Sequence, residues 1–254
     1  MKYKAVVSDV DGTLVHSALD ALPSKRVVDV VTRLQEAGIH FCIATGRPLA
    51  YAMRIIEALN LTSPVVVQGG ASVYDPVKKV TVWEQTIALP AVKKVLEVLK
   101  NEHYKYDAII DGIPHFNIDE NLQKRVTCIG VFKVPKSDHE RLKKKIEGIS
   151  GIHITSSSGW DGPKYISVDI TAPEATKLHG ILKISQILSI DTKEIVGIGD
   201  HYNDFPLLLA CGFKIAMGNA VEDLKAIADY VAPPLSEDGA AEAIERFVLS
   251  GIDD

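Results

Sequence analysis

The sequence predicts an α/β protein with a doubly wound, Rossmann-like parallel sheet as its core and an inserted α+β cap domain. Two observations predict this fold. Strand-like apolar segments alternate with amphipathic helical segments at both ends of the chain, and the alternation is interrupted between residues 83 and 170. The chain has 254 residues, enough for two modest domains. We therefore expect residues 1–82 and 171–254 to form the core and residues 83–170 to form the cap.

The N-terminal part of the chain reads as strand, helix, strand, helix, strand. In order, we expect these elements at residues 5–8, 25–37, 39–44, 49–59 and 65–67, with Gly38 ending the first helix. The strand segments are almost continuously apolar, which is typical of a parallel sheet with helices on both faces.

The C-terminal part repeats this alternation, and the insertion between the two parts does not. After residue 171 we expect a helix at 177–188, a strand at 195–198, a helix from 204, and short strands at 214–216 and 230–232. Within the insertion we expect helices at 89–101 and 136–147 and strands at 126–134, 153–156 and 165–170. Asp111-Gly112, between strands at 107–110 and 113–116, predicts a two-residue hairpin turn.

Composition excludes several classes of protein. The formal net charge of −5 gives no broad basic surface, so we expect neither a nucleic acid nor a membrane as partner. Cys42, Cys128 and Cys211 are far apart in the sequence and lack the spacing of a zinc or redox site. No apolar stretch reaches the length of a membrane span, and no signal-peptide pattern opens the sequence. We therefore expect a cytoplasmic monomer or small homo-oligomer.

Two carboxylates stand at the end of the first apolar strand. Asp9 and Asp11 are two residues apart, so strand geometry directs both side chains to the same side of the chain. Open parallel sheets bind their ligands at this carboxyl edge. Taken alone, the pair is equally compatible with residues of a simple strand-end turn.

A second acidic group follows the predicted strand at 195–198. It contains Asp200, Asn203 and Asp204, with Asp200 directly at the strand end. Carboxylates gathered at one sheet edge repel one another unless a cation lies among them, and oxygen ligands suit Mg²⁺. A helix cap with a solvated aspartate behind it is the alternative.

Thr45 and Gly46 end the second strand and precede a helix, where a hydroxyl and free backbone amides can hold a phosphate oxygen. Lys177 begins a later helix and can bring an ammonium group to the same phosphate. The alternatives are a plain helix cap for Thr45 and a surface position for Lys177.

Together these segments resemble the haloacid dehalogenase superfamily. The matching segments are Asp9-Val10-Asp11-Gly12-Thr13-Leu14, Thr45-Gly46-Arg47, Lys177 with Gly180, and Gly199-Asp200 with Asn203-Asp204. The insertion after the third strand, Met217-Gly218-Asn219-Ala220 and Glu237-Asp238-Gly239-Ala240 are similar to the Cof-type branch with a large α/β cap. One departure is Gln68, where that branch usually has asparagine.

The resemblance implies a Mg²⁺-dependent phosphatase that hydrolyses small-molecule phosphate monoesters through a phosphoaspartate. Asp9 would be the nucleophile, and Asp11 the general acid and then the general base. The implied phosphate-binding residues are Thr45, Gly46, Lys177 and Asn203. The implied metal ligands are Asp9, Asp11 through its backbone carbonyl, Asp200 and Asp204.

Two other functions remain open at this level. A phosphosugar mutase similar to phosphomannomutase would use the same core, with a phosphoaspartate that survives while the sugar reorients. A non-catalytic regulatory protein on the same scaffold is disfavoured because the acidic set is complete. The expected partner is a small phosphorylated metabolite of unknown identity. Arg47 has no assigned role, and the polar cap residues His115, Trp160 and Lys164 are not assigned to the site.

Overall fold

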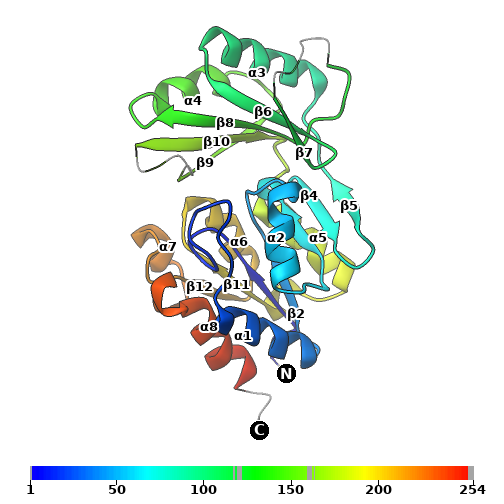
Figure 1. Ribbon diagram of the computed structural model, residues 1–254, viewed down its shortest axis with the longest axis vertical. Coiled ribbons are helices and arrows are strands. Elements are labelled where there is room, and N and C mark those ends of the chain that lie inside the picture. The colour runs from blue at the N-terminus through cyan, green and yellow to red at the C-terminus, as the bar shows by residue number, and fades with distance from the viewer. Residues whose placement is uncertain (1, 117, 119–121, 159–161, 163, 251–254) are drawn as a thin grey trace.

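The structure is a computed structural model that describes residues 2–116, 118, 122–158, 162 and 164–250. Figure 1 shows a core, built from the N-terminal and C-terminal parts of the described chain, and a cap above it. The core sheet is parallel, in the order β13-β12-β11-β1-β2. Its strands are β1 (Ala5–Ser8), β2 (His40–Ile43), β11 (Ile195–Gly199), β12 (Phe213–Ala216) and β13 (Tyr230–Val231).

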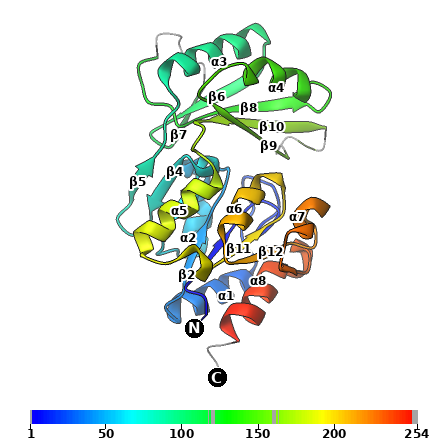
Figure 2. The same ribbon diagram turned by 180° about the vertical axis from the view of Figure 1, so that it is seen from behind.

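Helices cover both faces of the core sheet. They are α1 (Lys25–Glu36), α2 (Leu49–Ala58), α5 (Lys177–Leu188), α6 (Phe205–Ala210), α7 (Glu222–Ala226) and α8 (Gly239–Ile244). Figures 1 and 2 show α1 and α2 on one face and α5 and α6 on the other. The predicted α/β class is therefore confirmed. Among the described residues, no helix is both long enough and apolar enough to cross a membrane.

The register of the core sheet aligns the polar segments at one edge. Ser8, the last residue of β1, pairs with Ile43 of β2 and with Ile198 of β11. The residues that follow these strands therefore leave the sheet side by side. This alignment brings the motifs around Asp9 and Asp200 together although they are far apart in the sequence.

The third predicted strand joins the parallel sheet through a short contact. A parallel bridge between Ala44 and Val66 links β3 (Val65–Val67) to the end of β2, where the Thr45 N–H donates to the Val66 carbonyl at 3.0 Å. β3 also pairs antiparallel with β4 (Ser72–Asp75), and β4 pairs with β5 (Val80–Glu84). The chain reverses tightly between β3 and β4, where Gln68, Gly69 and Gly70 all have positive φ values of 56°, 67° and 118°.

The cap has an antiparallel sheet of its own, in the order β7-β6-β8-β10-β9. Its strands are β6 (Lys105–Ile110), β7 (Ile113–Phe116), β8 (Cys128–Pro135), β9 (His153–Ser158) and β10 (Tyr165–Thr171). Helices α3 (Leu89–Asn101) and α4 (His139–Glu147) cover its outer face, and the bare face points toward the core (Figure 1). Asp111 and Gly112 have φ values of 53° and 76°, as the predicted hairpin turn requires.

Candidate active site

Asp9 and Lys177 form the centre of the site. Asp9 directly follows β1 and is only 4% exposed, and Lys177 is the first residue of α5 and is 2% exposed. The Lys177 Nζ atom donates to Asp9 Oδ1 at 2.5 Å and to Asp204 Oδ1 at 2.5 Å. Burial alone would lower the pKa of Lys177, but the charges of Asp204 and Asp9 raise it above its ordinary value. The lysine therefore stays charged between two carboxylates.

Asp204 holds the loop after β11 in shape. Its Oδ2 atom accepts hydrogen bonds from the backbone N–H groups of Asp200, at 2.9 Å, and His201, at 3.0 Å. Gly199 permits this close packing, since a Cβ atom there would lie 2.6 Å from the Asp204 Cβ. The loop thereby presents Asp200 to the end of β1.

Asp200 lies against the loop that follows Asp9. Its Oδ1 atom accepts a hydrogen bond from the Thr13 hydroxyl at 3.1 Å. A Cβ atom on Gly12 would lie 2.3 Å from Asp200 Oδ2, so only glycine permits this approach. Burial, followed by the charge of Asp204, raises the pKa of Asp200 to about 7.

Asp9, Asp200 and Asp204 each offer a carboxylate oxygen, and these oxygens lie within 4.8 Å of one another. Burial and the charge of Asp204 raise the pKa of Asp9 well above its ordinary value, although Lys177 lowers it. Three carboxylates therefore share one ammonium group, which leaves a surplus of negative charge. A divalent cation with a preference for oxygen ligands fits this donor set.

Asp11 has a partner that sequence reasoning missed. Its two carboxylate oxygens accept hydrogen bonds from Nε and Nη2 of Arg47, at 2.8 and 2.7 Å, in a forked ion pair. Arg47 Nη2 also donates to the backbone carbonyl of Ala18 at 2.9 Å. The arginine is 1% exposed, so its geometry is fixed by packing. The Asp11 carboxylate is thus fixed by Arg47, outside the cluster of Asp9, Asp200 and Asp204.

The segment after β2 lies beside this pair. The Thr45 hydroxyl oxygen accepts a hydrogen bond from the backbone N–H of Arg47 at 3.0 Å, which leaves the hydroxyl proton able to donate. Gln68 is buried nearby, where its Oε1 accepts from the Ser72 hydroxyl at 3.2 Å. Within the described residues, Gln68 Nε2 has no hydrogen-bond partner.

A cavity lies between this edge of the core and the bare face of the cap. Core residues that line it include Asp9, Asp11, Gly46, Asp200 and Asn203. Thr45, Lys177 and Asp204 are buried at the same sheet edge, joined to these residues by the contacts above. The structure thus gathers all the site residues named from the sequence, while their individual roles stay predictions.

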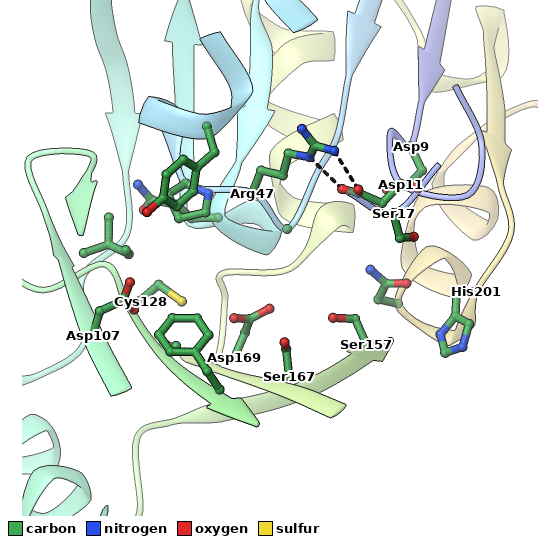
Figure 3. Close-up of a pocket in the computed structure, with 18 of the residues that line it drawn as sticks. Asp9, Asp11, Ser17, Arg47, Asp107, Cys128, Ser157, Ser167, Asp169 and His201 are labelled. Carbon is green, nitrogen blue, oxygen red and sulfur yellow. Dashed lines mark hydrogen bonds and ion pairs between the residues drawn. The ribbon is translucent and has the colours of Figure 1, made fainter. Parts of the chain in front are cut away.

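The cap contributes residues that sequence reasoning did not select. Asp107, Cys128, Ser157, Ser167 and Asp169 line the cavity and point toward the core in Figure 3. His115 and Lys164 are not among the lining residues, and Trp160 lies outside the described part of the chain. The available signal was the period of two along the cap strands, which puts alternate residues on the bare face.

Comparisons with known proteins show the relatives of this chain. The haloacid dehalogenase-like hydrolase family matches residues 6–112 and 111–244. The 5-amino-6-(5-phospho-D-ribitylamino)uracil phosphatase YitU of Bacillus subtilis (strain 168) is 25% identical, over 95% of this chain and 96% of its own. A phosphoglycolate phosphatase of Methanobrevibacter smithii is 26% identical, over 98% of this chain and 100% of its own.

Solved structures share the fold. A haloacid dehalogenase-like hydrolase from Bacillus subtilis has a TM-score of 0.83 at 22% identity, covering 96% of this chain and 100% of its own. Another, from Bacteroides thetaiotaomicron, has a TM-score of 0.80 at 23% identity, covering 96% of this chain and 99% of its own.

Proposed function

Since the chain belongs to the haloacid dehalogenase-like hydrolase family and is a phosphoric monoester hydrolase, we propose that it hydrolyses small-molecule phosphate monoesters through a phosphoaspartate on Asp9. The observation that carries this proposal is the position of Asp9. Its carboxylate lies on the cavity, held by Lys177 and beside two further carboxylates.

In the first step, a carboxylate oxygen of Asp9 attacks the phosphorus of the bound ester. The bond between phosphorus and the ester oxygen breaks, and the leaving oxygen takes a proton from the Asp11 carboxyl group. In this structure the fork from Arg47 occupies both Asp11 oxygens, so the fork must release one of them before Asp11 can carry this proton, while the other keeps the side chain in place. The products of the step are an acyl phosphate on Asp9 and a free alcohol.

In the second step, the Asp11 carboxylate takes a proton from water, and the water oxygen attacks the phosphorus. The bond between phosphorus and the Asp9 oxygen breaks, which releases inorganic phosphate and restores the Asp9 carboxylate. Asp11 is protonated again and ready for the next ester. The same residue therefore serves both steps, as acid and then as base.

Attack of a carboxylate on a phosphate dianion brings like charges together. The Lys177 ammonium and the Thr45 hydroxyl offset this charge on the transferring group, with Gly46 and Asn203 lining the same space. The proposed ligands of Mg²⁺ are Asp9, the backbone carbonyl of Asp11, Asp200 and Asp204. When bound there, Mg²⁺ supplies positive charge to the phosphoryl oxygens.

The test is release of inorganic phosphate from a panel of esters, with Mg²⁺ and with excess chelator. We expect turnover that needs Mg²⁺ and needs no bisphosphate activator. Full activity in chelator would remove the metal from the proposal, and an absolute need for a bisphosphate would favour a phosphosugar mutase. Rapid-quench mass spectrometry of Asp11→Asn with an aryl phosphate should place the phosphoryl group on Asp9.

A further inference from the structure

The bare face of the cap carries a row of two carboxylates separated by a glycine. In the antiparallel register, Gly130 of β8 pairs with Asp107 of β6 on one side and with Asp169 of β10 on the other. Residues opposite one another in neighbouring strands point to the same face of the sheet. All three line the cavity that contains Asp9, and Figure 3 shows both carboxylates pointing toward the core.

Glycine is required in the middle of this row. A Cβ atom on Gly130 would lie 2.7 Å from Asp107 Oδ1 and 3.2 Å from the ring of Phe132. The Asp107 carboxylate therefore leans over Gly130, into the place that a side chain there would take. A ligand group that approaches Gly130 from the cavity meets a carboxylate from each neighbouring strand.

These carboxylates have no cation of their own. Among the residues that the structure describes, the ion pairs found at this cavity join Arg47 to Asp11 and Lys177 to Asp9 and Asp204, and none of them includes Asp107 or Asp169. Asp107 is 1% exposed, and its Oδ1 atom has no hydrogen-bond partner within the described chain. Burial raises the pKa of this carboxyl, and the backbone N–H of Gly130 offsets that rise only in part. A buried acceptor without a full donor is costly, by about 1–3 kcal/mol, and a small shift of the carboxylate toward the cavity would bring it within reach of a donor on a ligand.

Asp169 also reaches toward the core. Its Oδ2 atom is 3.7 Å from the position that a Cβ atom on Gly46 would take. Gly46 follows Thr45 at the proposed phosphate site, so the row lies above that site. Burial raises the pKa of Asp107 to about 6, and burial together with the charge of Asp107 raises the pKa of Asp169 to about 7. A bound cation would offset both charges.

We infer that Asp107 and Asp169 bind a protonated amine in the organic part of the substrate, so that the enzyme prefers phosphate monoesters of amino compounds. This inference rests on the proposed function and adds the substrate class to it. An ammonium group supplies three donors and a positive charge to the two carboxylates on either side of Gly130. A substrate with a carboxylate in that place would meet two like charges and be disfavoured.

The experiment compares substrates that differ at one group. The first set is O-phosphoethanolamine against 2-phosphoglycolate, and the second is glucosamine 6-phosphate against glucose 6-phosphate and N-acetylglucosamine 6-phosphate. We expect kcat/KM to favour the amine by about tenfold or more in at least one set, as a charge-assisted hydrogen bond would give. Absence of any advantage for the amine in both sets would overturn the inference.

Substitutions test whether Asp107 and Asp169 cause the preference for the amine. Asp107→Asn and Asp169→Asn should each reduce the amine-to-hydroxyl ratio of kcat/KM about tenfold, mainly through KM. Glu97→Gln, an equal change of charge on the exposed side of α3, is the control and should leave both the ratio and the basal activity unchanged. Unchanged ratios in both aspartate variants would overturn the inference.

Binding separates this inference from the proposed function. If no ester, para-nitrophenyl phosphate included, released phosphate, the proposed function would fail. Amine binding by Asp107 and Asp169 would still be tested by calorimetric titration of the wild-type protein with glucosamine 6-phosphate and with glucose 6-phosphate. Tighter binding of glucosamine 6-phosphate, with the difference lost in Asp169→Asn, would support the inference. Equal binding of the two compounds would overturn it.

Discussion

Two groups of carboxylates face the same cavity, and they differ in how their charge is balanced. At the core edge, Lys177 donates to Asp9 and Asp204, and Asp11 is held by the fork from Arg47. On the cap, no arginine or lysine of the described chain is paired with the carboxylates of the row defined by Asp107 and Asp169. Lys177 and Arg47 thus balance part of the charge at the core edge, and a divalent cation is proposed for the rest. For the cap row, the proposed partner is the amine of the substrate.

The largest effect is expected for a substitution of Asp9, among the core carboxylates. Asp9→Asn removes the attacking oxygen and should abolish turnover of every ester, whatever its leaving group, because no acyl phosphate can form. Phosphate release and rapid-quench mass spectrometry measure this. Glu36→Gln, on the exposed face of α1, is the control and should behave as wild type. Turnover by Asp9→Asn, or label on a histidine or serine, would contradict the mechanism.

The next prediction concerns Lys177, the cation that lies among the core carboxylates and has no counterpart in the cap row. Lys177→Ala should reduce kcat/KM by about 2 to 4 kcal/mol of transition-state stabilisation, the scale of a lost electrostatic donor. It also leaves Asp9 and Asp204 buried without their ammonium partner, so the free energy of unfolding should fall by about 3 kcal/mol. Kinetics and thermal unfolding check the two parts.

The matched control for Lys177→Ala is Lys193→Ala, at an exposed position of the core. It should change neither activity nor stability appreciably. Wild-type kinetics for Lys177→Ala would remove this lysine from the catalytic site, even if the protein were less stable.

The core site was predictable because its residues follow strand ends. Strand-end motifs such as Asp9 with Asp11, Thr45 and Asp200 come together wherever parallel strands share a carboxyl edge. The order of β3, β4 and β5 was not predictable from the apolar run alone. It depends on the reversal at residues 68–70, and the positive φ of Gln68 has no clear signal in its residue type.

A smaller effect is expected for Arg47, to which the sequence motifs gave no role. Arg47→Lys keeps the charge but loses the fork to Asp11, so kcat/KM for alkyl phosphates should fall about 10- to 100-fold. An aryl phosphate needs less protonation of its leaving oxygen and should be affected less. Equal losses for both kinds of ester would show that Arg47 acts on binding rather than on Asp11.

The cap row could not be found from the sequence for a physical reason. Asp107, Gly130 and Asp169 are far apart in the chain, and none of them belongs to a recognisable motif. Their juxtaposition depends on the antiparallel register across three strands, which apolar periodicity does not specify. Residues of this kind carry specificity without forming a motif.

A final effect, on stability rather than on rate, tests whether the cap row is held at a cost in stability. The pKa of Asp169 in the folded protein is about 7, above its ordinary value of 3.8. Between those two values the folded state keeps a proton that the unfolded chain loses, so wild-type stability falls as pH rises. The Asp169→Asn variant has no carboxyl group at this position, so its stability does not fall for this reason as pH rises. Near neutral pH it should be more stable than wild type by about 1 to 3 kcal/mol, and the difference should vanish toward about pH 4.

Glucosamine 6-phosphate should narrow the difference in stability between the two proteins, because it stabilises the wild type more than the variant. Chemical unfolding at several pH values measures this, with Glu97→Gln as control. A variant less stable than wild type at neutral pH would mean that a protein group already balances the Asp169 charge, and the contrast between core and cap would then be wrong.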